Sequence, residues 1–244
     1  MKKIQAILTA VKKGCYFELL LKVSANLVPQ WLILPGKTNI VAFEGSCIYL
    51  KRKVKNVVFR QASSEDLHEL LSCSNYNPKT DNLKELFSSY FSNNHLCFCL
   101  EYNDEIVGYA WAFLNNYTIT FDRYHRSNVL IRFQEHTVFL GDGFINSRYR
   151  LKGFFPVLLS GVVDNLHRDY QITKFLGHID TSNDLSFKSH LRLGFSHIST
   201  LYYVNILWMN YISLVDFVHP GQNQKVFRRH KSASLKNKEA DLEI

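Results

Sequence analysis

Hydrophobic and polar positions follow two different periods along most of the chain. From residue 56 onward, apolar residues at every second position and β-favouring runs predict strands at 56–62, 95–102, 105–114, 136–146, 173–180 and 197–218, with a less regular strand at 129–133. Helical spacing predicts helices that begin at Ser63 and Asp81, and two more over 153–169 and 184–193. This order of elements indicates an α+β domain with a mixed central sheet.

The two ends of the chain differ from this region. Residues 3–25 have apolar positions at helical spacing, interrupted near Gly14, which predicts an amphipathic helix, and 39–43 with 46–51 predict a short hairpin. The tail from Gln222 lacks apolar periodicity, so we expect it to be disordered. The sequence thus predicts an N-terminal helix and hairpin extension (1–55), a main domain (56–218) and a basic tail (219–244).

Charge and composition narrow the function classes. The 244 residues are 46% hydrophobic, which is enough for one large globular domain. The formal charge of +8 lies at the ends, because residues 1–58 carry +8 and 222–244 carry +3, whereas 59–221 carry −3. This distribution excludes a polycationic nucleic-acid binder in the main domain. The basic N-terminal helix either caps the main domain or makes weak contact with a membrane surface.

Cysteine and histidine spacing indicates neither a disulfide framework nor a metal site. The five cysteines include no C-x-x-C pair, and the histidines show no H-x-x-x-H arrangement. We therefore expect no metal and a reducing, cytoplasmic environment. The longest apolar stretch, 202–218, contains Asn205, Asn210 and Asp216, so no transmembrane helix is predicted.

The segment most informative about chemistry joins the strand at 136–146 to the helix at 153–169. Arg148, Arg150 and Lys152 surround a turn with one glycine, Gly153, before an apolar helix. Free backbone N–H groups and the positive end of the helix dipole favour an anion such as pyrophosphate at this kind of turn. The alternative is an ordinary solvated basic turn.

Several segments in order resemble the GNAT acetyltransferase superfamily. The stretch 149–155 resembles its Arg/Gln-x-x-Gly-x-Gly/Ala acyl-coenzyme A loop, and Asn183 to Ser186 with Leu193-Gly194-Phe195 resembles its second motif. Residues 58–67 and 104–110 are similar to its first strand and helix and to its hairpin. The likeness covers about residues 56–207 and implies a mostly antiparallel central sheet flanked by helices, with acetyl-CoA as co-substrate.

The resemblance also implies positions for the coenzyme. Backbone groups of Phe144 and Ile145 would bond the pantetheine arm, and Asn183 would lie against the coenzyme. The pyrophosphate would be held by backbone amides of Arg150, Leu151, Lys152, Gly153, Phe154 and Phe155. The chain departs from the family in two places: Phe155 stands where Gly or Ala is usual, and His190 stands where many members carry Tyr.

Three residues are candidates for proton transfer. Asp142 or Glu135, beside the strand at 136–146, would act as general base, and His190 would protonate the departing thiolate. Tyr109 and Trp111 alternate on their strand and would line an acceptor pocket. Each of these residues has an ordinary structural role as its alternative.

These features predict an enzyme that moves an acetyl or similar group from acyl-CoA to an amine by direct attack in a ternary complex. The acceptor would be a small-molecule or sugar amine, and the oligomeric state stays open. One alternative is a non-catalytic acyl-CoA-binding or sensing module, suggested by Phe155 and the missing Tyr. Another is a peripheral membrane acyltransferase that acts on an envelope precursor, suggested by the basic N-terminal helix.

Overall fold

The computed structural model describes residues 33–50, 54–77, 82–120, 128–206, 209–216, 227–230 and 240–243. The chain divides into two compact units. The larger unit contains residues 40–117 and 132–197, and the smaller contains residues up to 39, 118–131 and 198–242. All the residues that the sequence proposes for chemistry fall in the larger unit.

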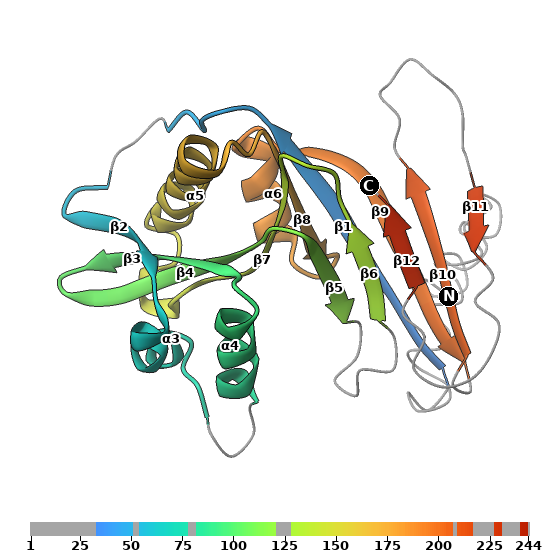
Figure 1. The fold of residues 1–244 in the computed structure, drawn as a ribbon, viewed down its shortest axis with the longest axis horizontal. Coiled ribbons are helices and arrows are strands. Elements are labelled where there is room, and N and C mark those ends of the chain that lie inside the picture. Colours follow the sequence, from blue (N-terminus) through green and yellow to red (C-terminus); the bar gives the residue numbers. More distant parts are fainter. Residues whose placement is uncertain are drawn as a thin grey trace, which may run out of the picture. The chain divides into compact units, whose positions relative to one another are not determined.

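The larger unit is built on a sheet with helices on both faces (Figure 1). Its neighbouring strands follow the order β1-β8-β7-β4-β3-β2. The pairs β2–β3, β3–β4 and β4–β7 are antiparallel, and β7–β8 is parallel. The elements are β1 (Ile33–Glu44, of which 40–44 lie in this unit), β2 (Val57–Ala62), η1 (Ser64–Asp66), α3 (Leu67–Cys73), α4 (Leu83–Ser92), β3 (Leu96–Tyr102), β4 (Glu105–Phe113), β7 (Thr137–Ile145), η2 (Ser147–Tyr149), α5 (Phe154–Tyr170), β8 (Lys174–Asp180) and α6 (Asp184–Arg192). The predicted α+β class and mostly antiparallel sheet are confirmed.

Alternation along the strands sends different side chains to the two faces. On β4, Ala110 and Ala112 join the core under α5, and their small side chains let the helix approach the sheet closely. Tyr109 and Trp111 point to the opposite face, where Phe87 of α4 contacts both rings. Figure 1 shows α5 on one side of these strands and α3 with α4 on the other.

Local signals in the sequence set several of these elements. Asn103 and Asp104 both have positive φ (52° and 61°), as a two-residue hairpin turn between β3 and β4 requires. Ser63 and Asp66 form a capping box at the start of η1, where the sequence predicts a helix to begin. The Asp66 carboxylate also accepts two hydrogen bonds from the Arg60 guanidinium, at 2.9 and 2.8 Å. These contacts fasten the first helical segment to β2.

In the smaller unit, the described residues are mainly in strands. It holds most of β5 (Asn116–Thr120), β6 (Asn128–Arg132), β9 (Ser196–Ile206) and β10 (Met209–Asp216), together with β11 (Phe227–His230) and β12 (Ala240–Glu243). The pairs β9–β10 and β10–β11 are antiparallel. The predicted closing strands over 197–218 are therefore confirmed as β9 and β10.

Three expectations for the chain ends have different outcomes. The predicted hairpin is wrong, because β1 is a single 12-residue strand and 46–50 form no strand. Ile48 is buried and its carbonyl accepts a hydrogen bond from Ser160 of α5, so this segment packs on the helix instead. The tail contains β11 and β12, where disorder was expected. The amphipathic helix at 3–25 lies outside the described residues.

Candidate active site

Strands β7 and β8 part near the middle of β7. They pair from Thr137 and Lys174 to Leu140 and Gly177, whereas the other edge of β7 stays paired with β4 as far as Ile145. Within the described strands, the β8-facing edge of residues 141–145 therefore has no strand partner. An extended ligand with amide groups can satisfy such an edge. Phe144 and Ile145, the predicted pantetheine contacts, lie on this stretch.

Arg150 lies over the end of this open edge. Its Nε donates to the Ile145 carbonyl oxygen at 3.0 Å, and its guanidinium carbon lies 5.2 Å from the centre of the Phe144 ring. The arginine therefore places positive charge at the end of β7, between the strand opening and the turn that follows. A ligand that reached the Ile145 carbonyl would compete with this side chain.

A β-bulge in β7 decides where Asp142 points. Tyr109 pairs with Phe144 and Trp111 pairs with Gly141, so Asp142 and Gly143 together oppose one residue of β4. Asp142 has a φ of 45°, in the left-handed region. The bulge turns its side chain toward the α4 face, where the Tyr90 hydroxyl donates to Oδ2 at 2.8 Å.

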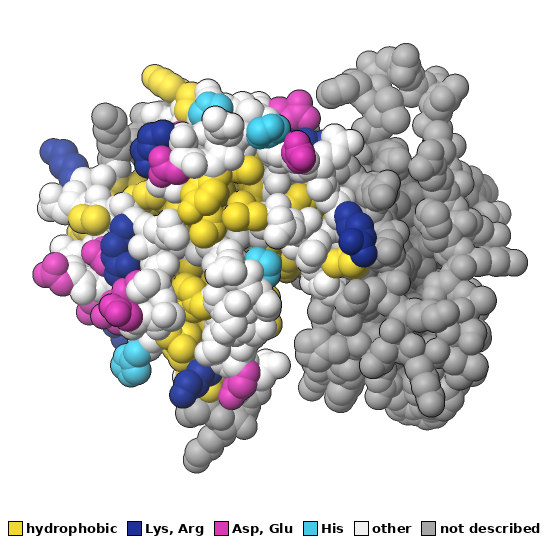
Figure 2. All heavy atoms as spheres, in the orientation of Figure 1, with side chains coloured by type: hydrophobic (Ala, Val, Ile, Leu, Met, Phe, Trp, Pro, Cys, Tyr) yellow, Lys and Arg dark blue, Asp and Glu magenta, His cyan; other side chains and the backbone are white. Residues whose placement is uncertain are grey.

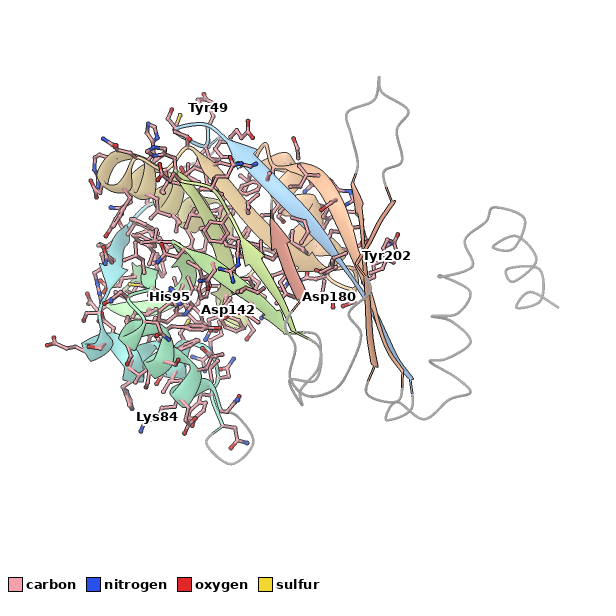
Figure 3. The ribbon with its side chains drawn as sticks, turned by 45° about the vertical axis from the view of Figure 1, so that its right-hand side comes forward. Tyr49, Lys84, His95, Asp142, Asp180 and Tyr202 are labelled. Atoms are coloured by element: carbon pink, nitrogen blue, oxygen red, sulfur yellow. The ribbon has the colours of Figure 1, made fainter. Side chains whose placement is uncertain are left out.

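The surroundings of Asp142 suit a carboxylate that takes up a proton. The residue is exposed to solvent, but protein atoms surround it densely, and this desolvation raises its pKa although the Tyr90 hydrogen bond lowers it. Asp142 and His95, both labelled in Figure 3, are each in contact with Tyr90. A raised pKa makes the carboxylate a stronger base than a solvated aspartate.

The turn before α5 offers unpaired backbone N–H groups. Gly153 is the N-cap of α5 with φ 89°, and Leu151 also has positive φ (62°). Alternation of left-handed and right-handed residues directs successive N–H groups to one side. No residue of the described chain accepts from the amides of residues 151–155. Pro156, at the third helical position, removes a donor that would have no partner within the helix.

The ring of Phe155 points away from this turn. It packs at the edge of the core cluster and meets the His190 ring edge-on, with 5.2 Å between centroids. The bulky residue at the position usually held by Gly or Ala therefore leaves the backbone amides of the turn uncovered.

His190 lies between two aromatic rings on α6. Phe195 contacts it on one side (5.1 Å) and Phe155 on the other, and Nδ1 lies 2.9 Å from the Ser186 carbonyl oxygen. Burial lowers the pKa of His190, so the imidazole is neutral at pH 7. A neutral ring with one nitrogen already bonded to the backbone is suited to packing α6 against α5.

Glu135 is placed apart from Asp142, and Asn183 caps a helix. Glu135 is exposed in the turn before β7, and the five steps from Thr137 to Asp142 alone span about 17 Å. Asn183 caps α6, where its side chain accepts from the Ser186 amide at 3.2 Å. The structure therefore does not bring Glu135 and Asp142 to one reaction centre.

Sequence reasoning overlooked two residues at this site. Tyr90 lies in the helix predicted from Asp81 onward, and no motif in the sequence marks it for the site. Asn146 caps η2 through the Arg148 amide (3.1 Å) and donates to the Cys73 carbonyl oxygen (2.9 Å), so it ties the end of β7 to α3. A signal for the bulge was present, since glycines inside a strand often mark one, and Gly141-Asp142-Gly143 interrupts an otherwise apolar strand.

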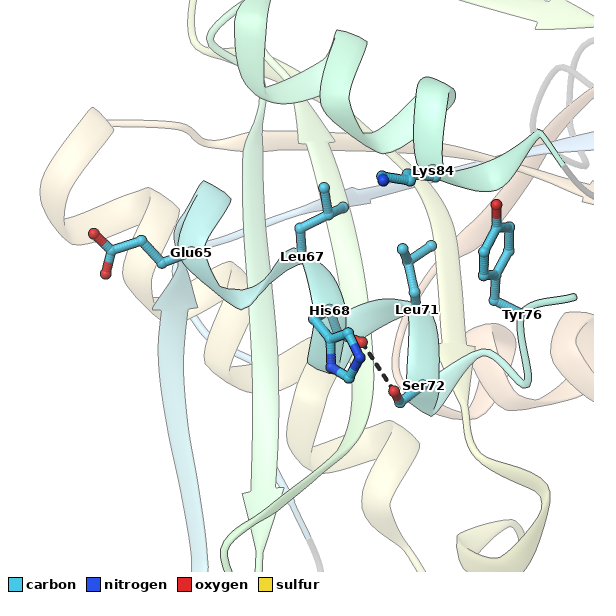
Figure 4. Close-up of a pocket in the computed structure, with 7 residues that line it drawn as sticks. All are labelled: Glu65, Leu67, His68, Leu71, Ser72, Tyr76 and Lys84. Atoms are coloured by element: carbon cyan, nitrogen blue, oxygen red, sulfur yellow. Dashed lines mark hydrogen bonds between the residues drawn. The ribbon is translucent and has the colours of Figure 1, made fainter. Parts of the chain in front are cut away.

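A separate pocket of about 560 Å³ lies between α3 and the start of α4 (Figure 4). Its lining includes Leu67 and Leu71 with Tyr76 and Lys84, and none of the predicted site residues. Figure 2 shows hydrophobic side chains gathered in the middle of the described surface and charged ones around its margin. Among the described residues, no group of His, Cys, Asp and Glu is arranged to hold a metal ion.

Comparison with known proteins identifies the family. The acetyltransferase (GNAT) family model matches residues 64–195, more than half of the chain. The chain belongs to the GNAT acetyltransferase family, which agrees with the resemblance found in the sequence. No curated protein matches the chain. Acyl transfer from acetyl-CoA is the general activity that this membership supports.

Solved structures add a likeness of fold. The chain is similar to a functionally unknown conserved protein from Staphylococcus epidermidis, with 16% identity, a TM-score of 0.50, and coverage of 76% of this chain and 65% of that one. It is also similar to the ribosomal-protein-S18-alanine N-acetyltransferase from Escherichia coli (14%, TM-score 0.44, covering 57% and 76%). An N-acetyltransferase from Staphylococcus aureus Mu50 matches at 20% identity and TM-score 0.42, covering 63% and 99%. The chain thus spans slightly less than two thirds of the Staphylococcus epidermidis protein.

No helix among the described residues is both long and apolar enough to cross a membrane.

Proposed function

We propose that this protein transfers an acetyl or similar acyl group from acyl-CoA to an amine by direct attack in a ternary complex. The observation that carries the proposal is the opening between β7 and β8, which has Asp142 at its bulge and the unpaired amides of residues 151–155 beyond its end. The open strand edge at Phe144 and Ile145 would bind the amide-containing pantetheine arm. The amides from Arg150 to Phe155 would bind the pyrophosphate, and Asn183 would lie against the coenzyme.

In this proposal Asp142 is the general base. The amine nitrogen forms the new C–N bond to the acyl carbon, and the C–S bond breaks with its electron pair on sulfur. The proton lost by the amine goes to the Asp142 carboxylate and then to solvent. The thiolate takes up a proton from solvent. We assign no proton transfer to Glu135, because it lies before the start of β7, far from Asp142. We assign none to His190, because its ring is neutral and packed between two aromatic rings.

The acceptor would be a small-molecule or sugar amine. A non-catalytic acyl-CoA-binding module would need the same cradle but no base. The carboxylate at the bulge, with its raised pKa, favours the enzyme. The alternative of a peripheral membrane enzyme depends on residues 3–25, which lie outside the described residues.

Calorimetric titration with acetyl-CoA and with CoA tests the donor site. We expect micromolar binding, and we expect Gly153→Glu to weaken it at least tenfold, because the new carboxylate adds bulk and negative charge where the pyrophosphate would lie (about 1.4 kcal/mol or more). Ser89→Glu, on the exposed side of α4, adds the same charge away from the turn and serves as control.

The outcomes separate the alternatives. Absence of binding by the unmodified protein would show that the turn is only a basic loop. Binding without release of CoA across a broad panel of amines would favour the non-catalytic module. Equal affinities for the Gly153→Glu variant and the unmodified protein would show that the turn is misassigned.

A further inference from the structure

Asp142 has a single hydrogen-bond partner within the described residues, and it is a tyrosine from another element. We propose that Tyr90 is a positioning residue that holds the Asp142 carboxylate for proton transfer on the α4 side of the sheet. The proposal rests on the function proposed above, because it assigns Asp142 the role of base. It adds a residue that neither the family motifs nor the sequence pattern marks.

The hydrogen bond from Tyr90 gives the two oxygens of the Asp142 carboxylate different roles. The Tyr90 hydroxyl donates to Oδ2 at 2.8 Å, and Oδ1 has no hydrogen-bond partner in the described part of the chain. Asp142 is exposed, and the amine would approach Oδ1, the oxygen that Tyr90 leaves unbonded. The proton therefore passes from the amine nitrogen to Oδ1 while Oδ2 stays bonded to Tyr90.

Other groups that face Asp142 are engaged elsewhere. Tyr109 on β4 and Tyr117 on β5 lie close enough for the Asp142 charge to raise their pKa values further. The Tyr109 hydroxyl is 2.8 Å from the Ser74 hydroxyl, and the Tyr117 hydroxyl is 3.3 Å from Nε2 of His178 on β8. No lysine or arginine in the described residues forms an ion pair with Asp142. Tyr90 is thus the group that fixes the carboxylate.

Packing holds Tyr90 where its hydroxyl is needed. Its ring meets Trp111 and Phe113 edge-on, each with 5.0 Å between centroids, and Phe87 lies 6.3 Å away on the same helix. A ring held this way loses little further freedom when its hydroxyl bonds to Asp142. A phenylalanine ring could make the same ring contacts as Tyr90. The packing therefore accounts for the ring but not for the hydroxyl.

The hydroxyl also affects when Asp142 is ionised. Desolvation by the surrounding protein atoms raises the pKa of Asp142, and the hydrogen bond from Tyr90 lowers it by favouring the carboxylate. Removal of the hydroxyl leaves only the upward effect. The carboxylate then gains its proton at a higher pH, so the acidic limb of the rate moves to higher pH.

The test compares Tyr90→Phe with the unmodified protein by two measurements. Carbon-13 NMR of labelled aspartate, with the Asp142 signal assigned from Asp142→Asn, follows the titration of the carboxyl group. Release of CoA from acetyl-CoA, with 2-phenylethylamine as the probe acceptor, gives kcat and KM against pH. Tyr170→Phe, at the exposed end of α5, is the control for loss of a tyrosine hydroxyl.

We expect Tyr90→Phe to move the Asp142 titration and the acidic limb of kcat to higher pH. We also expect kcat at pH 7 to fall about tenfold with little change in KM for acetyl-CoA. In the Asp142→Asn background the same change should cost nothing more, because Tyr90 acts through Asp142. Tyr170→Phe should match the unmodified protein.

Two results would overturn the proposal. One is an Asp142 titration that is the same with and without the Tyr90 hydroxyl. The other is an equal loss of kcat from Tyr90→Phe in the presence and in the absence of the Asp142 carboxylate. Failure of the acyl transfer itself is distinguishable, because no CoA would then be released by the unmodified protein, while the NMR titration would still report whether Tyr90 sets the protonation of Asp142.

Discussion

Gly161, in the middle of α5, gives a direct test of how this helix lies on the sheet. A Cβ atom at this position would lie 2.5 Å from Cδ2 and 2.7 Å from Cγ of Phe59 on β2. The Phe59 ring cannot simply swing aside, because it stacks on Phe98 with 5.7 Å between centroids and 10° between planes. Gly161→Ala should therefore force the helix and the sheet apart.

Two opposing effects set the size of the loss. Overpacking of this kind costs about 1–3 kcal/mol, whereas alanine in place of glycine inside a helix favours folding by about 1 kcal/mol. We expect a net loss of up to about 2 kcal/mol in the free energy of unfolding. At about 2–4 °C per kcal/mol for a chain of this length, Tm should fall by up to about 8 °C.

Thermal and urea unfolding followed by circular dichroism measure the effect. Phe59→Leu removes the ring atoms that the new methyl group would meet, so Gly161→Ala in that background should be neutral or stabilising by up to about 1 kcal/mol. If Gly161→Ala stabilised the protein with Phe59 intact, helix propensity alone would explain the change. The packing of α5 against β2 described here would then be wrong.

Two further predictions concern pH. The Arg60 guanidinium and the Ser63 amide lower the pKa of Asp66 to about 2, so the contribution of this carboxylate to stability is present above about pH 4 and is lost as the pH falls toward 2. Asp66→Asn should therefore lower the free energy of unfolding by about 1–2 kcal/mol at pH 7, and the unfolding curves of the variant and the unmodified protein should converge at pH 2. Burial lowers the pKa of His178 to about 4. Between about pH 6.5 and 4 this histidine is therefore protonated in the unfolded chain but not in the folded one, and the free energy of unfolding should fall by up to about 1.4 kcal/mol for each unit by which the pH is lowered. His178→Phe should make this slope shallower, because the lowered pKa of His190 still contributes, while the exposed His68→Phe should leave it unchanged. An unchanged slope in the His178→Phe variant would contradict the assignment.

The sequence by itself determined the order of the main helices and strands from residue 56 to residue 216 and the turn before α5. Local signals explain this success: the Asn103-Asp104 turn, the Ser63 to Asp66 capping box, and the change from alternating to helical spacing near Gly153 all act within a few residues. The same locality let this turn be proposed as the coenzyme loop, because its backbone N–H groups follow one another along the chain. The family assignment rested on these short-range features.

The predicted hairpin failed because its second arm meets a distant helix. Residues 46–51 have strand-like composition, but the Ile48 carbonyl bonds to Ser160, 112 positions later in the chain. No property of the segment itself reveals that partner. Burial of Ile48 against α5 therefore decided the outcome.

Tertiary structure alone decided which residues meet at the site. Strict alternation along β7 would place Asp142 on the same face as Val138 and Leu140, but the bulge turns it to the opposite face, 52 positions from Tyr90 in the chain. The same fold turns the Phe155 ring toward His190 and leaves Glu135 at the far end of the strand. Periodicity describes a strand in isolation, whereas the pairing of β4 with β7 and the packing of α4 on β4 determine which side chains share a face and come within hydrogen-bond distance.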